Sequence, residues 1–223
     1  MIASSLCARL ITPFAPLTAA LPYSTFSEND LVIAIDGGYQ MCGKLGIKPA
    51  VLIGDFDSLN PDEKKQIEAS GIKVISHPQN KNETDTELAL QYCLQNGIKE
   101  VCIYNTLDGR FDHALALVQN LLEAHLANIK CRIVSSSQIV FLLDERTKTD
   151  FPIGTILSLL AISPSATFIS SHGLLYPLDE ITLFNWQSRG ISNSVTEPEQ
   201  TITLKNGTAL AVVTLQDANP AKS

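Results

Sequence analysis

Acidic and amide side chains gather in four short segments of the sequence, each directly after a run of residues typical of a buried β-strand. The four segments are Asp36-Gly37-Gly38, Asp55-Phe56-Asp57-Ser58, Asn80-Lys81-Asn82-Glu83-Thr84-Asp85 and Asn105-Thr106-Leu107-Asp108-Gly109-Arg110-Phe111-Asp112-His113. In an open sheet of parallel strands the carboxyl ends lie at one edge, where ligands bind. Carboxylates that meet there with one arginine and one histidine suit a polyphosphate held through divalent cations, since carboxylates alone repel phosphate.

The second segment places two carboxylates two residues apart. Alternate residues of an extended strand face one side, so Asp55 and Asp57 could hold a hard cation between their oxygens. A turn rich in Asp and Ser that caps the following helix is the structural alternative. The position directly after an apolar strand favours the functional interpretation.

The third and fourth segments each lead into a predicted helix. Thr84 and Asp85 are ordinary residues for a helix start, but a helix N-terminus also favours phosphate. Arg110 follows a glycine, which lets the backbone approach a ligand while the guanidinium forks onto phosphate oxygens. A solvated turn with an ion pair between Arg110 and Asp112 is the alternative. His113 could shuttle a proton or act as an orienting hydrogen-bond partner.

Two other features leave their role open. Asp36-Gly37-Gly38 could approach a phosphate or a nucleotide, although its spacing does not match GxGxxG and the P-loop pattern GxxxxGK[ST] is absent. Trp186 is the only tryptophan and lies in a polar stretch. It could be a buried anchor or a wall on which an aromatic ligand stacks.

Strand-like and helix-like segments alternate in the part of the sequence that must position these residues. From Leu31 to Val134, apolar β-branched runs alternate with helical periodicity, which predicts βαβ units and a parallel sheet. The predicted helices span residues 61–70, 84–96 and 112–127.

The pattern changes after Ser135, where short apolar runs follow one another at hairpin-like spacing. Asn206-Gly207 between two such runs predicts a type I′ hairpin. We therefore expect an α/β fold with an α/β domain over residues 1–146 and an all-β sandwich domain over residues 147–223.

Composition narrows the class of protein. The hydrophobic fraction of 45% and the charged fraction of 17% exclude a disordered chain. The net charge of −7 argues against nonspecific binding to nucleic acid or to an anionic membrane. Five scattered cysteines without a CxxC pair favour a reducing compartment. No apolar stretch is long enough to cross a bilayer, so we expect a cytoplasmic protein.

The order and spacing of the motifs resemble those of the thiamine pyrophosphokinase family, whose members make thiamine diphosphate and AMP from thiamine and ATP. The resemblance covers nearly the whole chain from Leu31 onward and rests on Asp36-Gly37-Gly38, Gly54-Asp55-Phe56-Asp57-Ser58, Lys81-Asn82-Glu83-Thr84-Asp85, Gly109-Arg110-Phe111-Asp112-His113, Gly173…Tyr176-Pro177-Leu178 and Ser192-Asn193. Two positions depart from the family pattern. Asn82 replaces the first aspartate of KDxTD, and Ser194 replaces the glutamate of SNE. Both changes bear on metal affinity and rate, and neither bears on the fold.

The resemblance implies a homodimer in which each chain has a Rossmann-like α/β domain and a β-sandwich. ATP and Mg²⁺ would lie at the acidic edge, and thiamine would lie against the partner's β-sandwich at the subunit interface. The implied metal ligands are Asp55, Asp57, Asp85 and Asn82. The implied catalytic residues are Asp57, Arg110, Asp85 and Asp112. The implied ATP contacts are Asp36, Gly37, Gly38, Lys81, Thr84, Arg110 and His113. The implied thiamine contacts are Trp186, Ser192 and Asn193.

Three other functions compete with this one. A phosphatase of the haloacid-dehalogenase type is suggested by Asp55-Phe56-Asp57 after a strand, but Leu59 stands where that class has Thr or Val. A non-catalytic thiamine or nucleotide binder is suggested by Asn82 and Ser194. Diphosphate transfer to a different alcohol, such as a pterin, is excluded by the resemblance alone. Release of AMP that depends on thiamine would distinguish thiamine pyrophosphokinase activity from these three alternatives.

Overall fold

The computed structural model describes residues 6–17, 27, 29–56, 62, 65, 67, 69–78, 80 and 82–215. The chain divides into two compact units, Met1–Ser136 and Ser137–Ser223. This division lies upstream of the boundary expected after residue 146, because strand β7 (Gln138–Leu142) pairs with a strand of the second unit. Within the described residues, no helix is long and apolar enough to cross a membrane.

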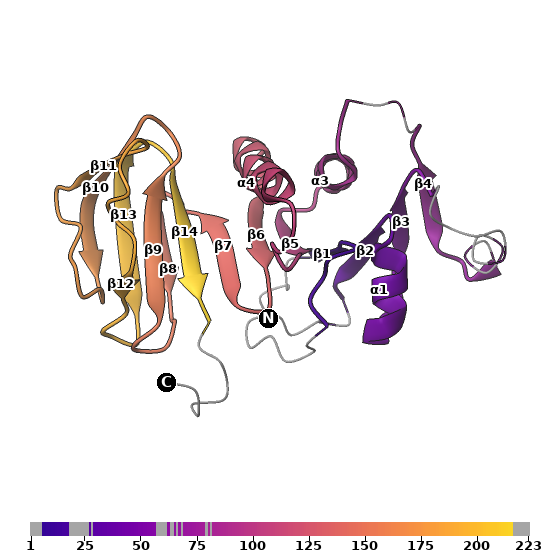
Figure 1. Ribbon diagram of the computed structural model, residues 1–223, viewed down its shortest axis with the longest axis horizontal. Coiled ribbons are helices and arrows are strands. Elements are labelled where there is room, and N and C mark those ends of the chain that lie inside the picture. The colour runs from indigo at the N-terminus through magenta and orange to yellow at the C-terminus, as the bar shows by residue number, and fades with distance from the viewer. Residues whose placement is uncertain are drawn as a thin grey trace. The chain divides into compact units, whose positions relative to one another are not determined.

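The first unit contains a sheet of six parallel strands in the order β6-β5-β1-β2-β3-β4 (Figure 1). The strands are β1 (Cys7–Ile11), β2 (Leu31–Ile35), β3 (Val51–Gly54), β4 (Lys73–Ser76), β5 (Glu100–Tyr104) and β6 (Lys130–Val134). The central strands are almost wholly buried, which suits their largely apolar sequences in a sheet that is covered on both faces. The registers align the strand ends, since Ile11 pairs with both Ala34 and Tyr104.

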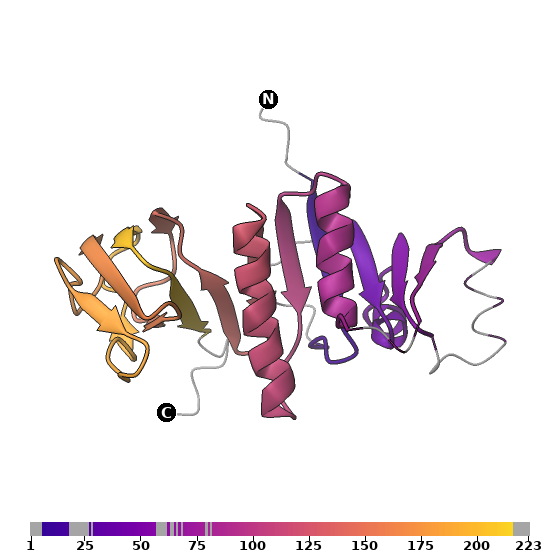
Figure 2. The same ribbon diagram turned by 90° about the horizontal axis from the view of Figure 1, so that it is seen from above.

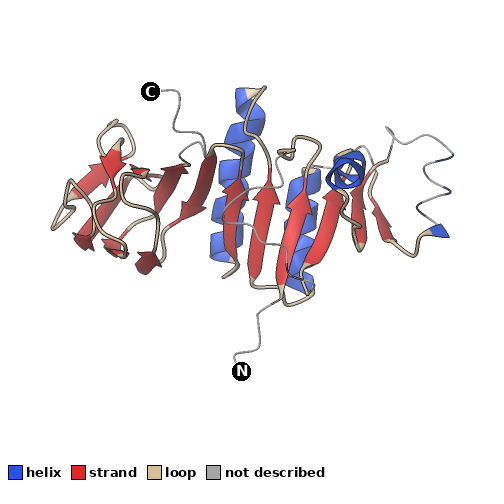
Figure 3. Ribbon diagram, turned by 90° about the horizontal axis from the view of Figure 1, so that it is seen from below, coloured by secondary structure: helices blue, strands red, loops and turns tan. Residues whose placement is uncertain are grey.

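Three described helices cover this sheet. They are α1 (Gly38–Leu45), α3 (Asp85–Gln95) and α4 (Phe111–Leu126). Figure 3 shows α1 on one face of the parallel strands and α3 and α4 on the other, and Figure 2 shows α3 and α4 side by side along the strands. The predicted helices that begin near Thr84 and Asp112 are confirmed to within one residue at each end. The predicted helix over 61–70 lies mostly outside the described residues.

Helix α1 was not predicted from the sequence. It contains two glycines in eight residues, and glycine is unfavourable in a helix interior. Tertiary packing explains the first of them. A Cβ atom on Gly38 would lie 1.9 Å from the carbonyl oxygen of Ile11, so the helix starts against the backbone of β1.

The second unit contains two antiparallel sheets and, among its described residues, no helix. One sheet has the order β12-β9-β14-β7, with β12 (Asn193–Ser194), β9 (Ile156–Ala161) and β14 (Ala209–Thr214) beside β7. The other has the order β11-β10-β13-β8, with β11 (Thr182–Phe184), β10 (Ser165–His172), β13 (Gln200–Asn206) and β8 (Arg146–Thr149). Burial alternates along β9 and along β13, so each of these sheets buries one face.

The predicted hairpin at Asn206-Gly207 is wrong. The chain does turn there, and Gly207 has a φ of 82°. However, β13 pairs with β10 and β8, whereas β14 pairs with β7 and β9. The turn therefore passes the chain from one sheet to the other. Asn206 is not among the residues of positive φ, which a type I′ turn needs at both central positions.

Candidate active site

The segments that follow β2 and β3 touch each other at the carboxyl edge of the parallel sheet. The Asp36 N–H donates a hydrogen bond to the carbonyl oxygen of Ile53 at 2.8 Å. A Cβ atom on Gly54 would lie 3.1 Å from the Asp36 Cα. Asp55 follows directly and is half-buried. The structure thus brings the Asp36 and Asp55 segments together, as the strand-end argument predicts.

The expected geometry of Asp55-Phe56-Asp57 is wrong in one respect. Phe56 is buried and has a φ of 57°, so the segment is not extended. The alternation that would place both carboxylates on one side of a strand therefore ends at Phe56. Asp57 itself lies outside the described residues, as does Lys81.

The third segment ends at the N-terminus of α3. Thr84 is the N-cap residue, and its side-chain oxygen accepts a hydrogen bond from the Glu87 N–H at 3.2 Å. The structural interpretation of Thr84 as a capping residue is therefore confirmed. Asp85 begins the helix and is half-buried, and Asn82 is exposed. Because Asp85 and Glu87 both occupy the first turn, an anion would approach this terminus only with a cation between the charges.

Arg110 and Asp112 form a two-pronged ion pair at the N-terminus of α4. Arg110 Nε donates to Asp112 Oδ1 at 3.1 Å and Arg110 Nη2 donates to Asp112 Oδ2 at 2.5 Å. Both side chains are exposed, at 74% and 62%. The hydrogen bond from Arg110 lowers the pKa of the Asp112 carboxyl and the same bond raises the pKa of the guanidinium, so both groups stay charged at neutral pH. The guanidinium is held in place and remains open to a ligand.

His113 is exposed, and its backbone N–H donates to Asp112 Oδ1 at 3.1 Å. The Asp112 carboxylate therefore accepts hydrogen bonds from the Arg110 side chain and from the His113 backbone N–H. This geometry fits Asp112 as the residue that orients Arg110.

Thr12 was not singled out from the sequence, and Asn105 was named there only as the first residue of the fourth segment, without a role. They follow β1 and β5 at the same carboxyl edge, and Asn105 Nδ2 donates to Thr12 Oγ1 at 3.0 Å. Asn105 is the first residue of the loop that leads to Arg110. A signal was present in the sequence, since each residue directly follows an apolar strand.

The donor atoms at this edge suit Mg²⁺. Asp55, Asp85 and Asn82 offer carboxylate and amide oxygens, which are the hard ligands that this ion prefers. Among the described residues, no three His, Cys, Asp or Glu side chains form a group that could hold a metal ion. That finding is compatible with Mg²⁺, which commonly binds through one or two carboxylates together with the phosphates of its substrate.

In the second unit, Asn193 holds a loop rather than facing solvent. It is 4% exposed, its Oδ1 accepts from the Tyr176 N–H at 3.0 Å, and its Nδ2 donates to the Tyr176 carbonyl at 2.7 Å. Asn193 and Tyr176 line a pocket of about 270 Å³ together with Arg189 and Ile191. The neighbouring Ser192 is exposed.

We expect Asn193→Leu to lower the free energy of unfolding by about 2 kcal/mol, because it removes the two part-buried hydrogen bonds that the Asn193 amide makes to the Tyr176 backbone. Urea denaturation followed by circular dichroism measures this loss. Asn185→Leu is the matched control, since Asn185 is exposed and its backbone N–H makes the bond to Pro164. Equal midpoints for the two variants would show that Asn193 does not hold the loop.

Trp186 is 70% exposed, so the interpretation as a buried anchor is wrong. Its ring stacks on that of Phe184, with centroids 4.6 Å apart and planes inclined by 28°. One face of the indole therefore packs against the Phe184 ring. This arrangement is suited to stacking with an aromatic ligand.

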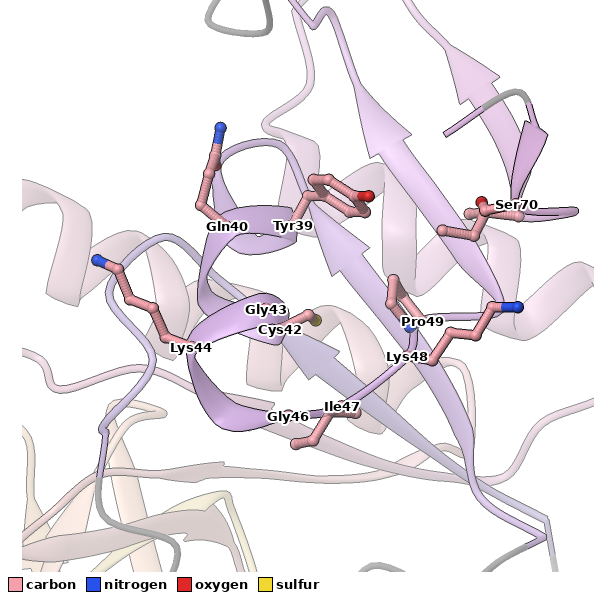
Figure 4. Close-up of a pocket in the computed structure, with 11 residues that line it drawn as sticks. Tyr39, Gln40, Cys42, Gly43, Lys44, Gly46, Ile47, Lys48, Pro49 and Ser70 are labelled. Atoms are coloured by element: carbon pink, nitrogen blue, oxygen red, sulfur yellow. The ribbon is translucent and has the colours of Figure 1, made fainter. Parts of the chain in front are cut away.

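Another pocket, of about 650 Å³, lies along α1 in the first unit. It includes Ile47, Lys48 and Pro49 before β3 and Ser70 and Ile72 before β4, so it extends toward the amino edge of the sheet. Figure 4 shows the amines of its two lysines pointing in opposite directions. Among its described lining residues, no two cations converge on a phosphate, and its size alone does not make it the active site.

Comparison with known proteins gives one family. The model of the thiamin pyrophosphokinase catalytic domain matches residues 23–133. A thiamine pyrophosphokinase of Bacillus subtilis is 25% identical over 195 residues, which are 83% of this chain and 87% of that protein. Thiamin pyrophosphokinase 1 of Caenorhabditis elegans is 26% identical over 172 residues, which are 73% of this chain and 68% of that protein.

Solved structures agree on the fold. The crystal structure of the thiamine pyrophosphokinase from Bacillus subtilis superposes with a TM-score of 0.82 at 22% identity, covering 94% of this chain and 99% of that one. The thiamin pyrophosphokinase from Candida albicans gives 0.78 at 18% identity, covering 95% and 90%. These likenesses confirm a mixed α/β fold with few helices. The catalytic-domain match and the curated relatives make this chain a member of the thiamine pyrophosphokinase family.

Proposed function

We propose that this protein is a thiamine diphosphokinase, which transfers the diphosphate of ATP to the hydroxyl of thiamine and releases AMP. The observation that carries the proposal is the carboxyl edge of the parallel sheet. There the chain of a family member presents Asp55 after β3, Asp85 at the start of α3, and an exposed, oriented arginine, Arg110, at the start of α4. Transfer of a phosphoryl group needs positioning and neutralisation of charge more than covalent chemistry, and these side chains supply both.

The residues divide the work as follows. The thiamine hydroxyl attacks the β-phosphorus, and Asp57 takes its proton. Arg110 binds phosphate oxygens through its two-pronged fork, with Asp112 as the orienting partner. Asp36, Gly37, Gly38, Lys81, Thr84 and His113 complete the ATP contacts.

The proposal includes Mg²⁺ held by Asp55, Asp57, Asp85 and Asn82. When bound, the ion neutralises phosphate charge, which an acidic edge cannot do by itself. Asn82 supplies a carbonyl oxygen without a charge, so only the three aspartates contribute negative charge to the metal site. We expect the site to bind Mg²⁺ more weakly than a site with a fourth carboxylate would.

The thiamine site is assigned to the second unit. Trp186 would stack on a ring of thiamine. Asn193 lines the pocket with Tyr176, and the exposed Ser192 precedes it in the chain, so both would contact thiamine there. In this proposal the first unit is Rossmann-like, the two antiparallel sheets form a β-sandwich, and the enzyme is a cytoplasmic homodimer whose active sites lie at the subunit interface. The parallel order of the first sheet and the alternating burial in the second unit support this architecture.

Trp186→Ala tests the stacking role. Loss of the indole should raise the KM for thiamine about fivefold to tenfold and leave the KM for ATP unchanged. Because Trp186 is exposed, the unfolding midpoint should stay that of the wild type. Trp186→Phe, which keeps an aromatic face, should restore most of the affinity. An unchanged KM for thiamine in Trp186→Ala would remove this residue from the site.

The activity itself is tested by incubating the purified protein with Mg-ATP, with and without thiamine, and measuring AMP and thiamine diphosphate by chromatography. We expect both products only when thiamine is present. Tight thiamine binding without AMP would instead indicate a non-catalytic binder. AMP release with a pterin alcohol and not with thiamine would reassign the acceptor.

A further inference from the structure

The side chains of Thr12 and Asn105 join the carboxyl ends of strands β1 and β5. Thr12 is 3% exposed, and its hydroxyl donates to the Tyr104 carbonyl at 2.8 Å. The same oxygen accepts the Asn105 amide at 3.0 Å and the Phe14 N–H at 3.3 Å. The hydroxyl of Thr12 thus fixes one end of the Asn105 side chain to the buried part of the sheet.

The other end of the Asn105 side chain sets the course of the following loop. Its Oδ1 accepts the Leu107 N–H at 2.9 Å, which closes a turn between a side chain and the backbone two residues later. Leu107 has a φ of 60°, a left-handed conformation that is unfavourable for a residue with a Cβ. The Thr106 N–H between them donates to the Phe14 carbonyl at 2.8 Å. Specific bonds therefore hold a turn that leucine would not adopt by itself.

This loop carries Arg110. Gly109, with a φ of 95°, is the last residue before Arg110, which is the N-cap of α4. The Arg110 side chain donates two hydrogen bonds to Asp112, two residues further on. They orient the guanidinium relative to its own helix and not relative to the strands. The turn at Leu107 is what connects Arg110 to the end of β5.

We propose that Asn105, anchored by Thr12, is a positioning residue for Arg110. Its side chain fixes the left-handed turn at Leu107 and so places the guanidinium at the carboxyl edge of the sheet. The inference rests on the proposed function and adds to it two residues outside the motifs that carry the family resemblance.

Three variants separate the bonds. Asn105→Leu removes the hydrogen bonds to Thr12 and to the Leu107 N–H while it keeps a similar side-chain volume. Thr12→Val removes the hydroxyl and keeps a similar shape, whereas Thr12→Ser keeps the hydroxyl. We expect kcat/KM for ATP to fall about tenfold or more in the first two variants and to stay within about threefold in Thr12→Ser, by comparison with other displacements of catalytic groups. Asn96→Leu is the matched control, because Asn96 Nδ2 bonds the Tyr92 carbonyl at 2.8 Å near the C-terminus of α3. It should retain wild-type kcat/KM.

A double-mutant cycle separates positioning from general damage. If Asn105 acts through Arg110, Asn105→Leu should lower kcat/KM little further once Arg110→Ala is present, less than about threefold. Fully multiplicative losses, equal to the product of the two single effects, would overturn the inference.

A measurement without substrates keeps the inference testable apart from the activity. Amide hydrogen exchange over residues 105–110 should be faster in Asn105→Leu than in the wild type and unchanged in Asn96→Leu. A wild type that makes no AMP would defeat the proposed function, and exchange would still decide whether Asn105 fixes the loop. Wild-type exchange in Asn105→Leu, or full activity of that variant in an active enzyme, overturns the inference.

Discussion

Replacement of Arg110 by alanine should lower turnover by about a hundredfold or more while the protein stays folded. The reason is that Arg110 is an exposed cation, oriented by Asp112 at the start of α4. In the proposed mechanism it binds the phosphate oxygens, over which negative charge spreads in the transition state. Losses of about 10²–10³ are typical when one preorganised donor to such charge is removed. The measurement is steady-state formation of AMP with saturating Mg-ATP and thiamine.

The fold should not depend on this residue, because both partners of the Arg110–Asp112 pair are exposed to solvent. Thermal unfolding of Arg110→Ala should therefore match that of the wild type. Arg110→Lys should fall between the two in activity, since it keeps the charge and loses the planar fork. Near-normal turnover in Arg110→Ala would exclude the residue from the mechanism.

Gly38→Ala should destabilise the protein by about 3 kcal/mol, the upper end of the usual cost of overpacking. The added Cβ would lie 1.9 Å from the Ile11 carbonyl oxygen and 2.8 Å from its carbonyl carbon, and both are backbone atoms of the sheet. To relieve the clash, the N-terminus of α1 must move away from β1. Because Gly37 and Gly38 belong to the proposed ATP contacts, the same shift should raise the KM for ATP.

Gly43→Ala is the matched control within the same helix. A Cβ at Gly43 meets nothing within 4 Å, so alanine there should add about 0.5–1 kcal/mol through its lower backbone entropy in the unfolded chain. Urea denaturation of the two variants should give midpoints on opposite sides of the wild type. Equal effects at both positions would mean that the contact between α1 and β1 does not constrain Gly38.

The sequence predicted the positions of the site segments because those positions follow from local patterns. Apolar runs before Asp36 and Asp55 became strands β2 and β3, and the cap at Thr84 began α3 as expected. Parallel pairing then brought the Asp36 segment against Gly54. These features depend on strand length, polarity and capping, which are visible in a short window of sequence.

Other features depend on partners far along the chain. The hairpin expected at Asn206-Gly207 fails because β13 and β14 find their partners in different sheets. The link between Thr12 and Asn105 joins residues 93 positions apart. No local pattern encodes which strand becomes a neighbour.

The backbone conformation of Phe56 and the exposure of Trp186 also could not be predicted from the sequence. Phe56 has a positive φ although phenylalanine disfavours it, so tertiary packing and not propensity sets that turn. Trp186 is exposed and stacks on Phe184, whereas the sequence left a buried anchor and a stacking wall equally open.

The most direct measurement follows the two outer phosphates of ATP through the reaction. ATP labelled in turn at the β- and the γ-phosphorus is incubated with the enzyme, Mg²⁺ and thiamine, and the products are separated. Attack at the β-phosphorus predicts that both labels enter thiamine diphosphate and that AMP is the other product. Release of the γ-label as inorganic phosphate without thiamine, with ADP left behind, would contradict the account.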